Sequence, residues 1–206
     1  MADVRERILA AAVEAAAIHG LSRLSVADVA KRAGLSRPTL YKHFPSREAL
    51  VAAAVQREAH AIIAEVGALV DAIDEPRAAL EAGVLLALRL VRDHPLLDRV
   101  VRTEPEALVP LLTTDAAPVM AAIRQPVVEM VGRKLPQLDA VVVRRLADML
   151  ARLLVSYALS APDDPPEVVA ALVADLVTHG VAHARRRPAV AASAAGAAPL
   201  PDEEAR

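Results

Sequence analysis

Residues 25–50 read SVADVAKRAGLSRPTLYKHFPSREAL, and this stretch decides the fold. Ser25 and Ser36 favour helix N-caps, while Gly34 between them favours the left-handed conformation that ends a helix. The spacing predicts two helices of about seven residues joined by a tight turn at 33–36. Two short helices joined in this way form a helix-turn-helix, whose second helix enters the major groove of DNA.

The second short helix, residues 36–44, has two unlike faces. Leu40 and Phe44 point one way, so we expect them to pack on the preceding helices. The other face presents side chains that hydrogen-bond to base edges or the DNA backbone: Arg37, Thr39, Tyr41, Lys42 and His43. The alternative is a helical corner of an ordinary bundle with a solvated polar face, because αα-hairpins are common.

Charge is divided unevenly along the chain. Residues 21–47 carry six basic side chains and one acid, a net charge of +5. Residues 1–47 together are +4 and the remaining 159 residues are −6, which sum to the total of −2. A basic segment on an acidic body is typical of a polyanion-binding module on a larger domain, although scattered surface charge is the alternative.

Composition favours a helical protein. Hydrophobic residues make up 55% of the 206, mostly Ala, Val and Leu, and the aromatics are Tyr41, Phe44 and Tyr157. The absence of cysteine excludes disulfides, thiolate metal sites and cysteine nucleophiles. The charged N-terminus is unlike a signal peptide, and charges interrupt every apolar run before about 18 residues, so we expect a cytoplasmic protein without a membrane span.

The stretch from Ser25 to Leu50 resembles the DNA-binding segment of the tetracycline-repressor (TetR) family, and the run TLYKHFPSREAL is the most specific part of the match. The resemblance covers about residues 5–50. It implies a homodimer of about nine helices per subunit, with a ligand cavity in the larger domain. One departure is Pro38, which alters how the start of the recognition helix meets the first base.

The resemblance also implies which residues contact DNA. Thr39, Tyr41, Lys42 and His43 become contacts of the recognition helix, and Arg37 and Pro38 become variable positions near base edges. Ser25, Ser36 and Arg47 are expected on phosphates, as helix N-termini favour anions.

The remaining chain is predicted to be helical throughout. Beyond a first helix at 3–20, helices are expected near 46–70, 76–92, 95–112, 117–134, 139–160 and 166–186, with kinks or breaks at Pro105, Pro110 and Pro126. The domain prediction is a helix-turn-helix domain over 1–46, a helical effector-binding and dimerisation domain over 47–187, and a disordered tail over 188–206.

The last two helices are the predicted dimer interface. The helix at 166–186 has two adjoining apolar stripes, one with Val168, Leu172 and Leu176 and the other with Val169, Val173, Val177 and Val181. One stripe can pack on its own subunit while the other meets a partner, so helices 139–160 and 166–186 would form a four-helix interface. Gly180 either permits close helix approach there or simply weakens the helix.

The effector site is weakly marked in the sequence. Helical faces suggest these lining residues: Met120, Ile123, Arg124, Val127, Met130, Leu153 and Tyr157. Tyr157 stands out because a buried phenol needs a hydrogen-bond partner. Arg124 and Arg89 are candidates for a carboxylate, with a solvated helix face as the alternative. Few aromatics and many aliphatic residues favour a small, largely apolar or acyl-type effector.

The sequence gives no sign of an enzyme or of a cofactor. It lacks a zinc-protease motif and a glycine-rich phosphate loop, and His179 and His183 form an isolated pair without a third metal ligand. The prediction is a ligand-responsive repressor that leaves a palindromic DNA operator when its effector binds. The alternatives are an activator of the same fold and a helical carrier of apolar ligands that does not bind DNA.

Overall fold

The computed structural model describes residues 3–107, 116–160 and 163–186. These residues form nine α-helices and one short 3-10 helix, with no strand among them, so the predicted all-α fold is confirmed. In chain order the elements are α1 (Val4–His19), α2 (Val26–Arg32), α3 (Arg37–His43), α4 (Arg47–Asp71), α5 (Pro76–Arg92), α6 (Pro95–Thr103), η1 (Pro105–Ala107), α8 (Ala116–Lys134), α9 (Ala140–Leu159) and α10 (Pro166–Arg186).

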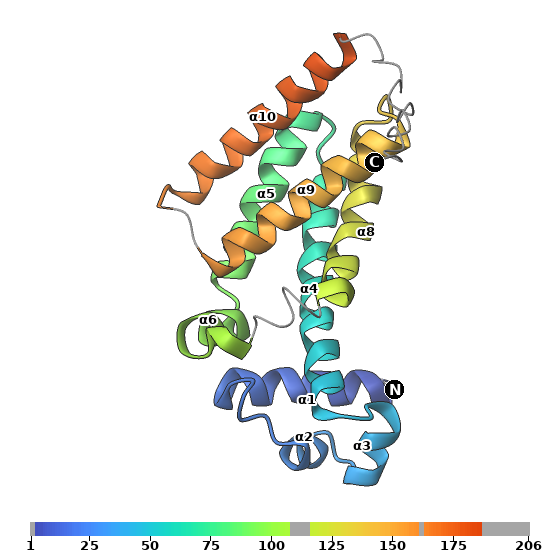
Figure 1. Ribbon diagram of the computed structural model, residues 1–206, viewed down its shortest axis with the longest axis vertical. Coiled ribbons are helices and arrows are strands. Elements are labelled where there is room, and N and C mark those ends of the chain that lie inside the picture. Colours follow the sequence, from blue (N-terminus) through green and yellow to red (C-terminus); the bar gives the residue numbers. More distant parts are fainter. Residues whose placement is uncertain (1–2, 108–115, 161–162, 187–206) are drawn as a thin grey trace, which may run out of the picture.

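Figure 1 shows two parts joined by one long helix. We call residues 3–46, with α1, α2 and α3, the head, and the elements from α4 to α10 the body. The first turns of α4 complete the head core, and its far end packs between α5 and α8. Since α4 has 25 residues, it spans about 37 Å and connects the two parts without a break.

Polar side chains cap the first four helices. Each cap accepts a hydrogen bond from a backbone N–H in the first turn: Asp3 from Arg5, Ser25 from Asp28, Ser36 from Thr39 and Ser46 from Ala49. Gly34 ends the second helix with a φ of +67°, a conformation that residues with a side chain rarely adopt. The helix-turn-helix therefore forms from the local signals that the sequence predicts.

The prolines predicted to kink or break helices have different effects in the structure. Within the segment predicted over 95–112, α6 ends at Thr103 and Pro105 opens the short 3-10 helix, so the break predicted at Pro105 is confirmed. At Pro126, by contrast, α8 continues as an α-helix. Pro110 and the tail predicted over 188–206 lie outside the described residues.

The head core reaches beyond the predicted boundary at residue 46. Its buried cluster includes Leu50 and Val51 of α4, and Leu96 and Val100 of α6. Leu96 and Val100 are no more than 1% exposed. Because α6 follows α5 directly in the chain, its insertion ties the head to the body at a second place besides α4.

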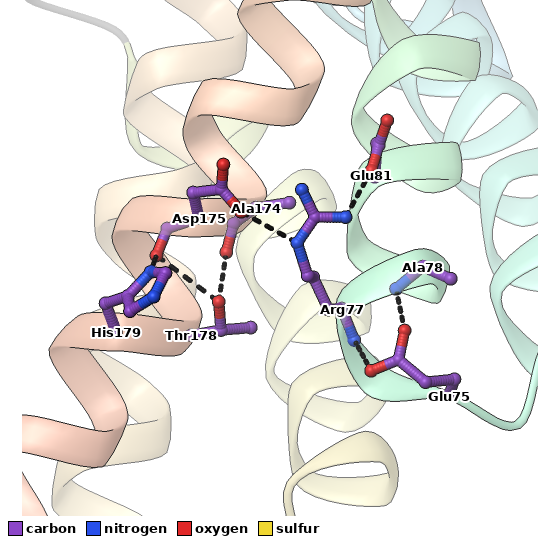
Figure 2. A network of polar contacts seen from close by, with 8 residues as sticks. All are labelled: Glu75, Arg77, Ala78, Glu81, Ala174, Asp175, Thr178 and His179. Carbon is purple, nitrogen blue, oxygen red and sulfur yellow. Dashed lines mark hydrogen bonds and ion pairs between the residues drawn. The ribbon is translucent and has the colours of Figure 1, made fainter.

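Charged contacts hold α10 against α5. Figure 2 shows the Arg77 guanidinium of α5 donating to the carboxylate of Asp175 on α10 and to that of Glu81, each at 2.7 Å. Further along α5, Arg89 donates to Glu167 at 2.6 Å. These exposed pairs contribute little to stability individually, yet they fix how α10 lies beside α5.

None of the described helices is both long enough and apolar enough to span a bilayer.

Candidate nucleic-acid interface and ligand cavity

The recognition helix α3 packs on the head core with Leu40 and Phe44, the two side chains predicted to face inward. Leu40 and Phe44 are only 1% and 2% exposed, and the guanidinium of Arg5 on α1 covers the Phe44 ring at 4.7 Å from its centroid. On the opposite side the large side chain of Tyr41 is 48% exposed. The helix therefore turns its polar face outward, and Figure 1 shows it at the end of the molecule far from α9 and α10.

The predicted DNA contacts fall into two groups in the structure. Exposed on and beside α3 are Ser36, Arg37, Pro38, Tyr41, Lys42 and His43. Ser25 and Thr39 are half-buried, and the hydroxyl of Thr39 shares a 2.8 Å hydrogen bond with that of Ser36. Because the Thr39 hydroxyl is engaged in this cap bond, its methyl group is the part that we expect to contact a base. Contacts with DNA stay a prediction for all of these residues.

Arg47 has a structural role that its sequence position did not reveal. Its guanidinium donates to the carbonyl oxygens of Leu21, Ser22 at 2.8 Å and Leu24 at 3.1 Å, all in the turn between α1 and α2. A planar fork of donors suits this task, because it satisfies several turn carbonyls at once. The predicted phosphate contact of Arg47 is untested, and its side chain already has these partners.

The basic residues from Arg5 to Arg47 divide between packing and surface. Arg5 covers Phe44, Arg7 donates to the carbonyl of Ala33 in the helix-turn-helix turn, and Arg47 holds the preceding turn. The others are exposed: Arg23, Lys31, Arg32, Arg37 and Lys42. These five cations, on a short segment that includes α2 and α3, provide the positive surface that a phosphate backbone requires.

The body contains an apolar cavity of about 80 Å³. Five helices line it with Ile63, Val66, Val70, Pro76, Leu80, Gly83, Val84, Val127, Met130, Val131, Lys134, Leu135, Leu146, Leu150, Leu154, Val177 and Thr178. No described lining residue is aromatic, as the composition predicts. The volume is below the several hundred Å³ typical of sites for drug-sized ligands, so the cavity fits a slender apolar group.

Only two of the seven predicted lining residues, Val127 and Met130, border this cavity. The other five lie elsewhere in the body: Met120, Ile123, Arg124, Leu153 and Tyr157. Arg124 is exposed and lies 3.9 Å from Asp148, whereas Tyr157 is half-buried against the body core. On α9 the lining residues are Leu146, Leu150 and Leu154, on a face rotated by one residue from the predicted Leu153 and Tyr157. Effector contacts for those five stay a prediction.

The outer faces of α9 and α10 are unusually apolar. Val168, Leu172 and Leu176 of α10 are 52–65% exposed, while the adjoining stripe of Val169, Val173 and Val177 is buried. On α9, Val141 and Met149 are likewise exposed. The separation into a buried stripe and an exposed stripe follows the pattern predicted for α10.

A polar joint connects α6 to the head. The carboxylate of Glu104 accepts a 2.7 Å hydrogen bond from the backbone N–H of Ser22, and this bond lowers the pKa of Glu104 below its ordinary value of 4.5. Gly20, with a φ of +87°, leaves the space that the carboxylate occupies, because a Cβ there would lie 1.7 Å from Glu104 Oε1. Glu104 was not predicted from the sequence, because its partner Ser22 lies 82 residues away.

A second set of polar contacts lies at the start of α6. The imidazole of His94 lies 2.9 Å from the carboxylate of Glu58 on α4, and both side chains are about 15% exposed. Hydrogen bonds from His94 and then Arg57 lower the pKa of Glu58. Arg57 also donates to Glu6 of α1 at 2.6 Å, so charged groups connect α1, α4 and α6.

The histidine pair has no metal-binding partners among the described side chains. His179 Nδ1 lies 2.8 Å from the carbonyl of Asp175, and the side chain of His183 lies outside the described part of the structure. No group of three or more metal-ligating side chains occurs in residues 3–107, 116–160 and 163–186.

A head with an outward-facing recognition helix, carried on a helical body with an internal cavity, defines a helix-turn-helix protein with a second, larger helical part. Family models agree over both parts. Residues 8–54 match "Bacterial regulatory proteins, tetR family", and residues 75–179 match "Bacterial Tetracyclin repressor, C-terminal domain".

A relative of similar length supports this assignment. The chain is 30% identical over 190 residues to Rv1255c, an uncharacterized HTH-type transcriptional regulator of Mycobacterium tuberculosis, and the match covers 88% of this chain and 89% of the relative. The protein therefore belongs to the TetR family of transcriptional regulators, as the resemblance of residues 25–50 implied.

Solved structures share the fold. The TetR family repressor AlkX from Dietzia, implicated in biodegradation of n-alkanes, superposes with a TM-score of 0.75 at 24% identity and covers 87% of this chain and 95% of its own. The fatty acid degradation regulator FadR from Bacillus halodurans gives a TM-score of 0.55 at 20% identity, covering 85% and 98% of the two chains.

Proposed function

We propose that this protein is a ligand-responsive repressor that binds a palindromic DNA operator as a homodimer in the cytoplasm and leaves it when a small, largely apolar effector occupies the body. The observation that carries the DNA-binding part is the geometry of α3. Leu40 and Phe44 bury one side of the helix, so Arg37, Tyr41 and Lys42 face solvent on the other. A polar helix face backed by a packed core suits the major groove.

Dimerisation is proposed through α9 and α10. Val168, Leu172 and Leu176 recur every four residues and form one exposed stripe of α10. Exposed apolar side chains in register along one helix favour association, and identical faces related by a two-fold axis bury each other. Two heads would then reach successive major grooves about 34 Å apart, which one short recognition helix cannot do.

The effector is proposed to bind in the cavity between α4, α5, α8, α9 and α10. Its aliphatic lining favours an aliphatic ligand, because burying apolar surface is the main force available there. Two regulators of the same fold are described by reference to n-alkanes and to fatty acid degradation. At 24% and 20% identity, these similarities support only the shared fold. The proposed ligand class rests on the aliphatic lining of this cavity.

The signal is proposed to travel through α4 and α6. Ile63, Val66 and Val70 of α4 line the cavity, and Leu50 of the same helix lies in the head core. The contact between Glu104 and Ser22 adds a second connection through α6. An effector shifts the balance only if it binds better to the conformation whose heads no longer match the operator.

The test is selection of bound DNA from a random pool with the purified full-length protein. We expect a palindromic site whose affinity falls steeply as salt concentration rises. The variant Lys42→Ala should bind this site about tenfold more weakly, because a groove-facing cation is lost. The matched control Arg92→Ala removes an exposed cation from the body and should bind as the wild type does.

Absence of any selected sequence, or equal binding by Lys42→Ala, would contradict the proposal. A reporter gene placed behind the selected site then decides the direction of regulation. Repression relieved by the effector supports a repressor, whereas expression that rises with the protein identifies an activator.

A further inference from the structure

The lining of the cavity is nearly uniform in chemistry. Of its 17 described lining residues, 15 have side chains without nitrogen or oxygen atoms. The two exceptions are Thr178 of α10 and Lys134, the last residue of α8. A ligand in this cavity is thus surrounded by aliphatic groups except where it approaches these two side chains.

Thr178 has no hydroxyl hydrogen left for a ligand. Figure 2 shows its Oγ1 bonded within α10: it donates to the carbonyl of Ala174 at 2.8 Å, and the carbonyl of Asp175 lies at 3.3 Å. A hydroxyl has a single proton to donate, and here the helix backbone receives it. Lys134 is therefore the donor that the described lining offers to a polar group.

Lys134 lies at the edge of the cavity, next to the turn between α4 and α5. Its ammonium donates to the carbonyl of Ile73 at 2.6 Å and, more weakly, to that of Asp71 at 3.4 Å. An ammonium has three N–H groups, so two carbonyls leave one available. These neutral partners orient the side chain without neutralising its charge.

Two of the three acids near the turn have other partners. Arg133 donates to both carboxylate oxygens of Asp71 at 3.0–3.1 Å. The Glu75 carboxylate caps α5, accepting from the N–H groups of Arg77 and Ala78, and these bonds lower its pKa. Asp71 and Glu75 are thus already engaged and Asp74 is exposed to solvent, whereas the ammonium of Lys134 borders the apolar cavity. A ligand anion placed there gains a charge-assisted hydrogen bond in surroundings of low polarity.

We infer that the effector is an aliphatic chain ending in a single carboxylate, whose head group binds Lys134 at the edge of the cavity while its chain lies among the aliphatic side chains. This inference rests on the proposed function, since it assumes that the cavity is the effector site. The volume of about 80 Å³ suits a slender alkyl chain rather than a fused ring system. Pro76, which also lines the cavity, is exposed at the same edge, so the head group stays close to water.

The experiment compares three probes with one chain length and different head groups: octanoate, octanol and octylamine. Calorimetric titration of the full-length wild type near neutral pH should give octanoate an affinity about tenfold or more above that of octanol, with octylamine weakest. Within a series of carboxylates, affinity should rise by up to roughly fourfold per methylene until the chain fills the cavity.

Variants of Lys134 locate the head group. Lys134→Met removes the charge while keeping a long apolar chain, so the preference for octanoate over octanol should disappear while octanol binds as before. Lys134→Arg should retain the preference. The control Arg92→Met removes the charge of another final residue on a cavity-lining helix and should match the wild type, because Arg92 is not among the lining residues.

Equal binding of octanol and octanoate by the wild type overturns the inference without any variant, even if Lys134→Met fails to fold. A preference that survives in a folded Lys134→Met overturns it as well, as does binding of neither probe. DNA selection is performed without ligand, so these failures are distinguishable from failure of the proposed function. If octanol and octanoate release operator DNA equally well, the proposed repressor function is supported and the inference of a carboxylate head group is wrong.

Discussion

The head and the body bury their cores to different degrees. The largest side chains that are under 2% exposed in the described residues all belong to the head cluster: Ile8, Val29, Leu40, Leu50, Leu96 and Val100. In the body, Val84 and Leu150 are among the best-buried large side chains at 4%, and they line the cavity. A filled head holds α3 in a fixed orientation, whereas a body with internal space can admit a ligand.

The most severe test of this comparison is the same truncation in each part. Leu40→Ala should lower the free energy of unfolding by about 3–5 kcal/mol, because a side chain enclosed on all sides leaves a new cavity. Leu150→Ala should lower it by about 2–3 kcal/mol, because one side of Leu150 already borders empty space. Urea denaturation measures both. Equal losses would show that the two cores are packed alike.

The second prediction concerns the exposed stripe of the body. Leu172→Glu should raise the dissociation constant of the dimer by about a hundredfold or more, because it places a charge in an apolar interface. Analytical ultracentrifugation measures this constant. Ile18→Glu is the control, since Ile18 of α1 is 53% exposed against 55% for Leu172. If Leu172→Glu leaves the dissociation constant of the dimer unchanged, α10 is not part of the interface.

The third prediction separates packing from DNA contact at Arg47. Arg47→Lys should lower the free energy of unfolding by about 1–2 kcal/mol, because an ammonium cannot serve all three turn carbonyls with the geometry of a guanidinium. The salt dependence of operator binding should stay as in the wild type. A smaller salt slope with unchanged stability would instead support the phosphate contact that the sequence predicted.

The smallest expected effect is at the joint between the two parts. Glu104→Gln should lower stability near neutral pH by about 0.5 kcal/mol, because the Ser22 N–H loses a charged acceptor in an exposed place. The folded pKa of Glu104 lies below 4.5, so its contribution is present above that value and is lost as pH falls through the lowered pKa. Denaturation from pH 7 to pH 3 should show wild type and variant converge, and a constant difference would exclude the carboxylate as the cause.

The head could be predicted almost completely because its signals are local. Ser25, Gly34 and Ser36 set the two short helices, and Leu40 with Phe44 fixed which face is buried. Contacts between residues far apart in the sequence could not be predicted from such local signals. Nothing near Leu96 or Glu104 in the sequence indicates that they pack on residues some 80 positions earlier, although His94, Pro95 and the four-residue spacing of Leu96 and Val100 do mark an amphipathic helix.

The cavity was harder to predict because α9 is apolar on several faces. With Val141, Val142 and Val143 in succession, periodicity leaves the rotation of the helix about its axis undetermined. The cavity-lining face proved to hold Leu146, Leu150 and Leu154, one residue away from the predicted Leu153. On α10 the two stripes were correctly separated, but only the structure shows which of them is exposed.

We propose above all that α3 of each subunit reads one half of a palindromic DNA site. Hydroxyl-radical footprinting of the dimer on its selected operator tests this most directly. We expect two protected half-sites related by a two-fold axis, with centres about one helical turn or a multiple of it apart, and we expect Lys42→Ala to need about tenfold more protein for the same protection. A single protected patch, or protection by Lys42→Ala at the same protein concentration as by the wild type, would show that α3 does not read the two half-sites.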